Sequence, residues 1–374
     1  MKILFVVSWY SSQNTKVLRE GIFHYEQAKE LKKYCDVAIY FPFDNEIDTE
    51  FSDSIEHGIR VFRRNNKNKS RLQQTINYLK DYKIIKNRFS PDIIHAHVAA
   101  GVGMIVTKWK LFYHKPYILT EHMPIEYMNL ENKKNYLRQK FIYKNSSQNI
   151  CVSKDLSEKL NSYYPNIKFS IIYNGIILPN NNINEKLDLF LSKDLNCGII
   201  AAFYDKTVKG YQYLLPAIKI LIEKGYNINL HICGGGQYLD YYKKMAIDLG
   251  IENNCIFYGQ IEKNQVYYII SKMDFIISAS IFESAGISVE EAMLLGKPLV
   301  VTRSGGASSL VNNKTAIVVD TKSTDALVKG IKNMIEKRAL FNSKEIKNYA
   351  INNFSIQTVT NQYLHLYNNL LNKS

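Results

Sequence analysis

Two glutamates, Glu283 and Glu291, flank the start of a segment with helical spacing, and their chemistry suits the recognition of hydroxyl groups. Each carboxylate can accept hydrogen bonds from two hydroxyl groups of a sugar. The helical segment starts at Gly286, so the free backbone N–H groups of Gly286, Ile287 and Ser288 favour an anion. Because Gly286 has no side chain, we expect a phosphate to approach the main chain there. The stretch therefore predicts a site for a phosphorylated sugar.

Chance also produces two glutamates at this spacing, so the neighbouring elements matter to the interpretation. The apolar run Phe275–Ile277 predicts a buried strand, and a loop over residues 280–285 connects it to the helix. Gly296 and Pro298 end the helix where such residues are expected. Glu290 is expected to be a solvated neighbour of the site. The predicted geometry is a strand end that leads into a helix N-terminus.

This stretch also resembles a known family. The resemblance rests on the strand followed in order by Ser280, Glu283, Ala285-Gly286, Glu291-Ala292-Met293 and Gly296-Lys297-Pro298. It is similar to the signature of the retaining glycosyltransferases of family 4, in which two glutamates separated by seven residues grip a nucleotide sugar. The resemblance implies that Glu291 holds the ribose hydroxyls and that Glu283 holds a hydroxyl of the donor sugar. Ala285 and the helix start would then face the diphosphate.

A second part of the resemblance lies at residues 201–210. Lys209-Gly210 matches the family's Lys-Gly pair, which implies that Lys209 neutralises the diphosphate as it leaves. Phe203 occupies the position where the family has an arginine, and we expect Lys206 to supply the second positive charge. A solvated loop lysine is the alternative for Lys209. Phe203 is also compatible with an inactive module that binds the donor without turning it over.

Several glycines and one asparagine resemble other turns of the family. Gly21 is similar to the glycine loop of the first domain, although the double glycine is absent, and a structural glycine at a helix start is the alternative. Gly234 and Gly259 resemble turns that face the nucleotide, and Asn174 resembles a strand end in the acceptor cleft. The triple glycine at residues 234–236 does not form G-x-G-x-x-G, so it is no dinucleotide fingerprint.

Three histidines near predicted strand ends offer a different chemistry. His95 and His97 alternate at the end of one strand, so their rings point to one face, and His122 follows the next strand. On chemistry alone, this trio could hold zinc and support a metal-dependent hydrolase. The resemblance instead implies that His97 lies near the transferred sugar and that His122 lines the same acceptor opening. We expect His95 to pack in the core. We predict no metal and no cofactor, and the sequence has no Asp-x-Asp pair for a metal-bound diphosphate.

Short apolar runs alternate with amphipathic segments along the chain, which is typical of βαβ units with a parallel sheet. The asparagine-rich stretch at residues 179–185 predicts a linker. We therefore expect an α/β protein with domains at residues 1–178 and 179–354 and a helix at residues 355–374. The resemblance implies the GT-B fold, in which two Rossmann-like doubly wound domains face each other across a cleft. It also implies that the last helix packs back on the first domain.

Strands are predicted wherever a short apolar run lies between turn residues. The first-domain strands are expected at residues 2–7, 35–40, 92–96, 117–120, 149–152 and 169–173, and the second-domain strands at 198–202, 229–233, 255–258, 275–278, 299–302 and 316–319. The first helix is expected at residues 17–33.

Composition limits the setting. The chain has 374 residues and a net charge of +14, and the segment Arg60–Arg88 holds ten basic residues and one acid. This segment could contact an anionic membrane or a lipid pyrophosphate, or be a solvated helix face, and no nucleic-acid module accompanies it. The five cysteines show no C-x-x-C spacing, which is typical of a reducing cytoplasm. No apolar run approaches the ~18 residues of a membrane span, and the N-terminal apolar run is too short for a signal peptide.

The sequence thus predicts a retaining, metal-independent glycosyltransferase. It would move a hexose or N-acetylhexosamine from a UDP- or GDP-linked donor to a glycan or lipid-linked acceptor. The predicted setting is cytoplasmic, with peripheral contact at the inner face of the cell membrane, in the synthesis of capsule, lipopolysaccharide or another cell-surface polysaccharide. A sugar-nucleotide epimerase of similar fold and the histidine-based hydrolase are the alternatives.

Overall fold

The computed structural model describes residues 1–11, 13, 21–178 and 195–372. The chain forms two units, one from Met1–Gly175 with Ile356–Ser374 and the other from Ile176–Ser355. The first division therefore falls three residues before the expected end at residue 178, and the second falls one residue after residue 354. The predicted linker at residues 179–185 and the start of the first predicted helix, residues 17–20, lie outside the described residues.

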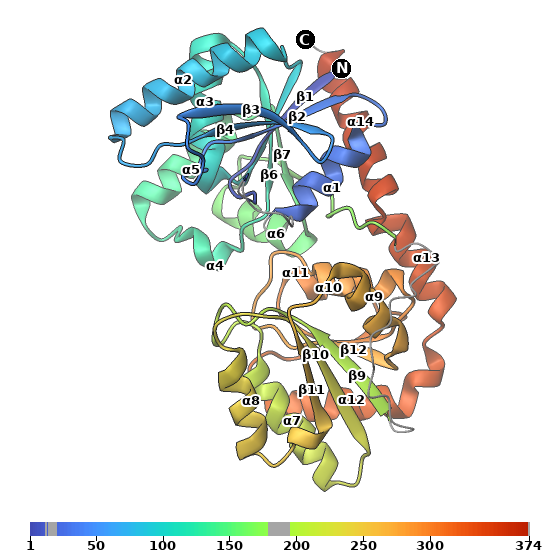
Figure 1. The fold of residues 1–374 in the computed structure, drawn as a ribbon. Coiled ribbons are helices and arrows are strands. Elements are labelled where there is room, and N and C mark those ends of the chain that lie inside the picture. The colour runs from blue at the N-terminus through green and yellow to red at the C-terminus, as the bar shows by residue number, and fades with distance from the viewer. Residues whose placement is uncertain (12, 14–20, 179–194, 373–374) are drawn as a thin grey trace. The chain divides into compact units, whose positions relative to one another are not determined.

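The first unit is built on an eight-stranded sheet with the order β3-β4-β2-β1-β5-β6-β7-β8 (Figure 1). All neighbouring strands are parallel except β3, which is antiparallel to β4. The strands are β1 (Lys2–Val6), β2 (Asp36–Phe41), β3 (Phe51–Glu56), β4 (Ile59–Arg64), β5 (Ile93–His97), β6 (Tyr117–Glu121), β7 (Gln148–Cys151) and β8 (Phe169–Ile171).

Helices alternate with these strands in the first unit. They are α1 (Ile22–Leu31), α2 (Arg71–Arg88), α3 (Met104–Tyr113), α4 (Ile125–Met128), α5 (Lys133–Asn145), α6 (Lys154–Tyr163) and α14 (Ile356–Leu371), and a π-helical turn, Val98–Gly103, connects β5 to α3. The last helix, α14, lies beside α1 (Figure 1) and buries Val359, Tyr363 and Tyr367 in the same core as β1 and β2. The C-terminal segment is therefore part of the first unit's core.

The second unit has a six-stranded, fully parallel sheet with the order β11-β10-β9-β12-β13-β14. The strands are β9 (Leu195–Ile200), β10 (Ile228–Cys233), β11 (Cys255–Gly259), β12 (Phe275–Ser278), β13 (Leu299–Thr302) and β14 (Ala316–Val319). The helices are α7 (Tyr211–Glu223), α8 (Leu239–Asp248), α9 (Lys263–Lys272), α10 (Ile287–Leu294), α11 (Gly306–Ser309), α12 (Thr324–Lys337) and α13 (Ser343–Phe354), with short 3-10 turns at Glu252–Asn254 and Arg338–Leu340.

Both sheets have the strand order of a doubly wound α/β fold. In the second unit the order of the strands along the chain is 3-2-1-4-5-6, and it reverses direction between β9 and β12. In the first unit it reverses between β1 and β5. Ligands of such sheets bind beyond the carboxyl ends of the strands at this reversal. Ligands are therefore expected at the loops after β1, β5, β9 and β12.

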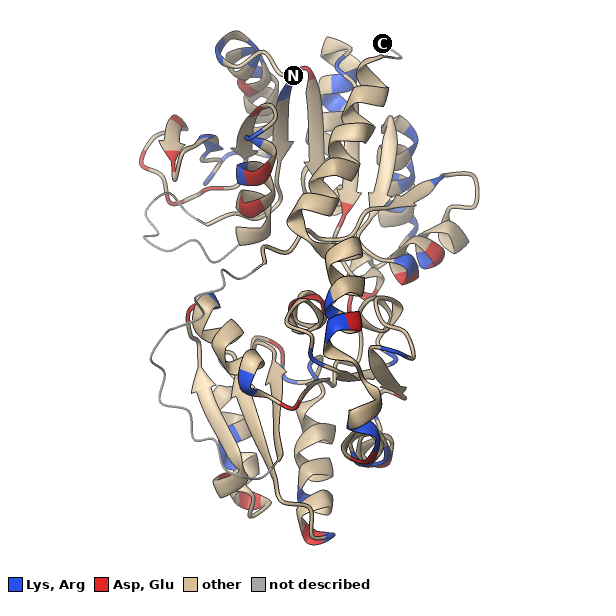
Figure 2. Ribbon diagram, turned by 90° about the vertical axis from the view of Figure 1, so that its right-hand side faces the viewer, with Lys and Arg blue, Asp and Glu red and all other residues tan. Residues whose placement is uncertain are grey.

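The segment Arg60–Arg88 is less of a free basic surface than its composition suggests. Arg63 is fully buried and pairs with Asp44 and Glu56 at 2.6 Å, and Arg64 pairs with buried Asp81. Figure 2 shows basic residues on both units with acidic residues among them. The buried arginines hold β4 between β3 and β2 in the sheet. Five of the remaining cations lie on α2, and Arg60, Lys67 and Lys69 precede that helix.

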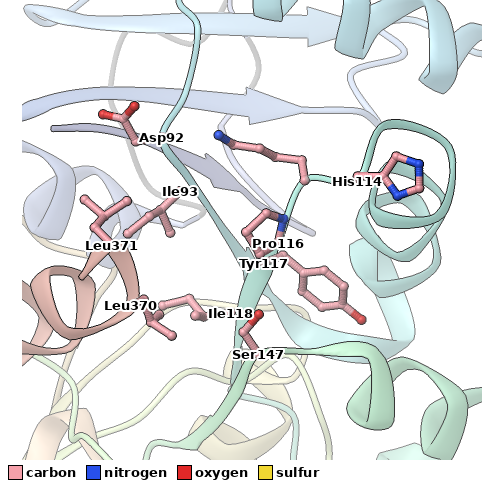
Figure 3. A pocket seen from close by; sticks show the side chains of 10 residues that line it. Asp92, Ile93, His114, Pro116, Tyr117, Ile118, Ser147, Leu370 and Leu371 are labelled. Carbon is pink, nitrogen blue, oxygen red and sulfur yellow. The ribbon is translucent and has the colours of Figure 1, made fainter. Parts of the chain in front are cut away.

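One pocket of about 430 Å³ lies at the amino ends of β5 and β6, the end of the sheet opposite to the predicted chemistry (Figure 3). Apolar side chains such as Ile93, Ile118, Leu370 and Leu371 form much of its wall. This position excludes it as the predicted donor or acceptor site, since those residues follow the carboxyl ends. Within the described part of the chain, no helix has the length and apolar character required to span a membrane.

Candidate functional site

The structure brings two predicted donor-site residues into direct contact. The Lys209 ammonium lies 2.6 Å from a carboxylate oxygen of Glu283, although the residues are 74 positions apart. Lys209 is in the loop after β9, and Glu283 is in the loop after β12, so the pair occupies the reversal point of the second sheet. The Ser280 hydroxyl donates a hydrogen bond of 2.8 Å to the same oxygen of Glu283. A cation, a carboxylate and a hydroxyl therefore converge where this fold binds ligands.

Backbone contacts hold the Lys209 loop against the loop after β12. Gly210 has φ +72°, and a Cβ there would lie 1.9 Å from the carbonyl oxygen of Ala279, so only glycine fits. The Ile281 N–H donates to the Val208 carbonyl at 2.7 Å. Asp205 accepts from the N–H of Val208 at 3.0 Å, which shapes the same loop. The position of Lys209 is thus set by main-chain packing rather than by its own ion pair.

The glycine at the start of α10 has a packing role that was not predicted. A Cβ on Gly286 would lie 2.9 Å from the Cβ of Ala307, so its lack of a side chain makes room for α11. On the side where a Cβ would project, Gly286 therefore packs against α11, and its role in phosphate binding stays a prediction. The next residues, exposed Ile287 and half-buried Ser288, occupy the first turn of α10 with amides at the positive end of the helix dipole. Ala285, immediately before this turn, is buried.

Glu291 lies in α10 and is buried with polar neighbours. The Tyr267 hydroxyl donates to Glu291 at 3.3 Å, and the Lys263 ammonium lies 3.9 Å from the same oxygen. Both partners come from α9, so this carboxylate is positioned by a neighbouring helix. Tyr267 and Lys263 were not identified from the sequence, because nothing in their spacing links them to the glutamate pair.

The adjacent Glu290 was predicted to be solvated, and this prediction is wrong. Glu290 is fully buried, and neither of its carboxylate oxygens has a hydrogen-bond partner among the described residues. Burial raises the pKa of Glu290 well above its ordinary value, and the neighbouring charge of Glu291 raises it further. This side of α10 packs within the unit, so a carboxyl group there is favoured in its neutral form.

Phe203 and Lys206, from the loop after β9, both contact aromatic rings. Phe203 is fully buried and stacks on Tyr211 with ring centroids 4.4 Å apart, so it belongs to the core of the unit. The Lys206 ammonium lies 4.3 Å from the ring centroid of Tyr241 on α8. In this structure Lys206 makes a cation–π contact, while Lys209 alone of the two pairs with Glu283.

The glycines of the predicted nucleotide-facing turns differ from each other. Gly234 has φ +153°, and a Cβ there would lie 2.1 Å from the Ala201 carbonyl oxygen, so this glycine is required by packing against the loop after β9. Gly259 has φ +67°, and a Cβ there would have no atom within 4 Å, so this residue borders open space. The Gly234 N–H donates to the Gly259 carbonyl at 2.9 Å, which joins the two turns. Gly259 is therefore the better placed of the two to face a ligand.

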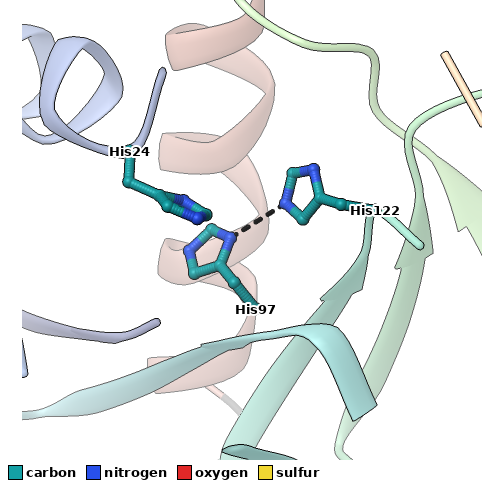
Figure 4. Close-up of side chains that lie close together, drawn as sticks. All are labelled: His24, His97 and His122. Carbon is teal, nitrogen blue, oxygen red and sulfur yellow. Dashed lines mark hydrogen bonds between the residues drawn. The ribbon is translucent and has the colours of Figure 1, made fainter. Parts of the chain in front are cut away.

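In the first unit, the histidine trio that the sequence suggested is not assembled. Both ring nitrogens of His95 are used, one with the Tyr367 hydroxyl and the other with Thr120, each at 2.7 Å. His24, in the first turn of α1, takes the place of His95 beside His97 and His122 (Figure 4). The zinc trio of His95, His97 and His122 is thus wrong in one member, since no motif indicated that α1 would reach this strand end.

His97 and His122 are hydrogen-bonded to each other, with 3.0 Å between His97 Nδ1 and His122 Nε2 (Figure 4). His97 is fully buried, whereas His122 is partly exposed. Burial lowers the pKa of both rings, that of His122 to about 3, so both are neutral imidazoles at physiological pH. The structure therefore places His97 behind His122.

A buried carboxylate that the sequence did not single out holds this region together. Glu121, the last residue of β6, accepts hydrogen bonds from the backbone N–H groups of Ala99, His122 and Met123 and from the Tyr143 hydroxyl, at 2.9–3.1 Å. Burial raises the pKa of Glu121, and these four donors oppose that rise. Glu121 thus fixes the loops that follow β5 and β6.

The backbone after His97 is strained. Val98 has φ +76°, a conformation that β-branched residues rarely adopt and that costs about 1–3 kcal/mol. Ser8 supports the turn by donating to the His97 carbonyl at 2.7 Å and accepting from the Val102 N–H at 3.3 Å. Gly101 is required here, since a Cβ would lie 2.1 Å from the Ser8 hydroxyl. The π-helical turn directly after His97 is a feature often found at functional sites.

Two predicted residues of the first unit remain, Gly21 and Asn174. Gly21 precedes α1 with φ +68°, and a Cβ there would lie 2.7 Å from the Trp9 carbonyl oxygen, which supports the structural alternative for this glycine. Asn174 is buried in the segment after β8. Gly21 and Asn174 are thus both packed within the first unit, and their roles in ligand binding stay predictions.

Comparison with known proteins identifies the family. Residues 199–353 match the family model described as "Glycosyl transferases group 1", and residues 22–178 match "Glycosyltransferase Family 4". The chain belongs to the group 1, family 4 glycosyltransferases. The predicted GT-B class, with two Rossmann-like α/β units, is confirmed.

This glycosyltransferase is similar to several proteins over part of its length. It is 29% identical to the uncharacterized glycosyltransferase MJ1607 of Methanocaldococcus jannaschii over 196 residues, so the match spans 50% of each chain. It is 28% identical to protein CapJ of Staphylococcus aureus over 59% of this chain and 57% of CapJ. It is 29% identical to a GDP-mannose-dependent phosphatidylinositol monomannoside mannosyltransferase of Mycolicibacterium smegmatis over 40% of this chain and 42% of that one.

Two solved structures show the same fold over the whole glycosyltransferase. Sucrose-phosphate synthase from Thermosynechococcus elongatus superposes with a TM-score of 0.83 at 16% identity, covering 100% of both chains. HepE from Anabaena, solved in complex with UDP, superposes with a TM-score of 0.76 at 18% identity, covering 99% of this chain and 100% of that one.

Proposed function

We propose that this glycosyltransferase moves a hexose or N-acetylhexosamine from a UDP- or GDP-linked donor to a glycan or lipid-linked acceptor, with retention of configuration and without a metal ion. The observation that carries the proposal is the Lys209–Glu283 pair at the reversal point of the second sheet. A nucleotide sugar carries both groups that such a pair recognises, since its diphosphate attracts the ammonium and its sugar hydroxyls donate to the carboxylate.

The donor would engage the two partners of this pair separately. The diphosphate draws the Lys209 ammonium, which frees a Glu283 oxygen to accept from a sugar hydroxyl. The amides of Ile287 and Ser288 at the start of α10 add partial positive charge. Glu291, fixed by Tyr267, accepts from the ribose hydroxyls. These groups act most strongly when the leaving diphosphate gains charge, so they lower the barrier rather than only tighten binding.

The transfer step needs no covalent intermediate with the protein. The bond between the anomeric carbon and the diphosphate oxygen breaks as the acceptor hydroxyl attacks from the same face, and the acceptor proton passes to the leaving diphosphate. Lys209 and the α10 amides stabilise that diphosphate, which replaces the positive charge that a metal ion would supply. The carboxylate of Glu283 keeps the sugar in place by accepting a hydrogen bond from a sugar hydroxyl.

In the first unit, His122 is the histidine able to contact an acceptor, because it is partly exposed. His97 would act through His122 by orienting its ring through the 3.0 Å hydrogen bond, which makes His97 a positioning residue. Gly259, beside open space, is the nucleotide-side turn, and Asn174 belongs to the acceptor side.

The acceptor and the setting are inferred from charge and from relatives. The name of the M. smegmatis relative specifies GDP-mannose and phosphatidylinositol monomannoside, and HepE was solved with UDP. Exposed cations of α2, such as Lys80, Lys83 and Lys86, suit an anionic membrane surface. We therefore place the reaction at the cytoplasmic face of the cell membrane, in the assembly of a cell-surface polysaccharide.

The test is a transfer assay with product analysis. The purified chain is incubated with UDP-glucose, UDP-N-acetylglucosamine or GDP-mannose and with membrane lipid extract, with and without EDTA. We expect release of one nucleoside diphosphate, a product with the anomeric configuration of the donor by NMR coupling constants, and no effect of EDTA. An inverted product would contradict retention, and an altered free nucleotide sugar formed without acceptor would favour the epimerase alternative.

A further inference from the structure

We propose that His24, His97 and His122 form a binding site for a single zinc ion at the carboxyl ends of β5 and β6. The three side chains each offer a ring nitrogen, and these nitrogens all lie within 4.8 Å of one another. They come from three separate elements, namely the first turn of α1, the end of β5 and the residue after β6 (Figure 4). Three imidazoles converging from different elements are the ligand set of several open zinc sites.

The distances are close to those that zinc requires. Zinc–nitrogen bonds of 2.0–2.1 Å in a tetrahedral site place the ligand nitrogens about 3.3 Å apart. His97 Nδ1 and His122 Nε2 are 3.0 Å apart, and the ring centroids of His24 and His97 are separated by 4.5 Å. Closing the largest nitrogen separation to the tetrahedral value requires a shift of roughly 1.5 Å, which side-chain rotation provides.

Several ring nitrogens of this cluster are buried without a hydrogen-bond partner in the described part of the chain, which favours metal binding. Both nitrogens of His24 and Nε2 of His97 are buried without a hydrogen-bond partner among the described residues. Buried polar groups of this kind normally have a partner, because leaving them unpaired lowers stability. A neutral imidazole presents one lone pair to a metal ion. A zinc ion held by His97 Nδ1 and His122 Nε2 would replace their mutual hydrogen bond, and it would give one nitrogen of His24 a partner.

The surroundings favour zinc over the common alkaline-earth ions. Phe23 packs against both His24 and His122, with ring centroids 4.0 and 5.1 Å apart, and the Trp9 ring lies 5.9 Å from that of His24. The ligand cluster found among the described residues contains no carboxylate, whereas Mg²⁺ and Ca²⁺ require several oxygen ligands. Imidazole nitrogen suits zinc and its neighbours in the transition series. His122 is partly exposed, so the ion can enter there and a water can fill the fourth position.

Zinc at this position has a predicted consequence for transfer. The ion would hold the ring of His122, which the proposed function assigns to the acceptor side. Zinc is therefore expected to inhibit the transferase rather than to activate it. Binding itself does not depend on that function, and it is measured without any nucleotide sugar, so the two proposals fail independently.

The test is isothermal titration of the tag-free, EDTA-treated whole chain with zinc chloride, with magnesium chloride in parallel. We expect one zinc ion per chain and no magnesium binding. His24→Gln should weaken zinc binding by about 100-fold or more, since even changes behind a ligand cost 10–100-fold. His95→Gln is the matched control, because His95 lies beside His97 but bonds Tyr367 and Thr120 instead, and it should bind zinc like the wild type.

Two further measurements keep the outcome clear if His24→Gln fails to fold. His122→Gln alters a partly exposed residue and should cause the same loss. Cobalt added to the wild-type chain should give the intense visible absorption of a four-coordinate site. No zinc binding by the wild type, equal binding by both ligand variants, or the weak spectrum of octahedral cobalt would overturn the proposal.

Discussion

Lys209 and Glu283 show how a site residue can be positioned by its neighbours rather than by its own contacts. Their ion pair is partly exposed, so it adds at most about 1 kcal/mol to the free energy of unfolding. The backbone contacts of Gly210 and Ile281 fix the loop independently. The pair is therefore available for ligand chemistry without endangering the fold.

Replacing Lys209 by methionine should lower kcat by about 100-fold to 1,000-fold, because the leaving diphosphate loses its main positive partner. The free energy of unfolding should change by less than about 1 kcal/mol. Steady-state kinetics and urea unfolding measure the two effects. Lys219→Met is the control, since Lys219 forms an exposed pair with Glu223 at 3.7 Å within one helix, and it should alter neither quantity. A large loss of stability in Lys209→Met would mean that the pair is structural.

Replacing Glu290 by leucine should stabilise the protein at neutral pH by about 1–3 kcal/mol, because a buried carboxyl group without partners is removed. The pKa of Glu290 is raised in the folded state, so Glu290 lowers the free energy of unfolding in a pH-dependent way. This pH-dependent loss is absent below the ordinary pKa near 4.5 and grows as the pH rises towards the pKa of the folded state. Urea unfolding at pH 4.5 and pH 8 should therefore show a larger gain at pH 8. Exposed Glu336→Leu is the control, and equal gains at both pH values would show that Glu290 is not neutral in the fold.

At the scale of elements, the loops after the strands are held by single buried groups. Glu121 ties the loops after β5 and β6 together, and Gly210 allows the loop after β9 to contact the loop after β12. Each can be tested by one substitution with a matched control.

The change Glu121→Gln should lower the free energy of unfolding by about 2–4 kcal/mol, because an amide NH₂ group faces backbone donors where a carboxylate oxygen accepted. It should also release the loop that carries His122. Denaturant unfolding gives the first effect, and the zinc affinity of the histidine cluster gives the second. Exposed Glu131→Gln should leave both unchanged. Wild-type stability in Glu121→Gln would contradict its role as the link between these loops.

The change Gly210→Ala should cost at least about 3 kcal/mol and weaken donor binding, since the new Cβ would lie 1.9 Å from a backbone oxygen. Gly225→Ala is the control that separates the cost of this clash from the cost of a positive φ angle. Gly225 has φ +84° with no atom within 4 Å of the Cβ position, so only the conformational cost of about 1–2 kcal/mol remains. Thermal unfolding compares the two, and similar losses would show that the clash is relieved by loop movement.

Strands made of continuous apolar runs were predictable from the sequence, and strands stabilised by buried charge were not. The strands predicted at residues 275–278, 299–302 and 316–319 have the bounds that the structure gives to β12, β13 and β14, because each is a continuous apolar run. β4 was missed, since its Arg63 and Arg64 suggested a surface and only their ion pairs explain their burial. The β3–β4 hairpin was therefore absent from the predicted strands.

The site was predictable where motif and strand end coincide. Lys209 and Glu283 follow two strands that are neighbours across the reversal, so the topology brings them together. His24 and Glu121 could not be assigned, because their roles depend on which helix packs over which strand end. Glu290 was wrongly predicted to be solvated. It is adjacent on α10 to Glu291, which has polar partners, but its own side chain points into the packed interior of the unit.

At the scale of the molecule, each unit carries one half of the proposed chemistry. The second unit holds the donor residues at its sheet reversal, and the first holds the histidines at its own. Since α14 completes the core of the first unit, the chain must cross from the first unit to the second and return. The central claim is that the second unit binds a nucleotide sugar without metal.

That claim is tested most directly by thermal unfolding of the whole chain with UDP-, GDP- and ADP-sugars, each with and without EDTA. A ligand at about 100 times its Kd should stabilise the protein by roughly 2.7 kcal/mol. We predict a raised midpoint with one nucleotide family, unchanged by EDTA and lost in Glu291→Ala, whose midpoint without ligand provides the baseline. No shift with any nucleotide sugar, or a shift that EDTA abolishes, would contradict the account.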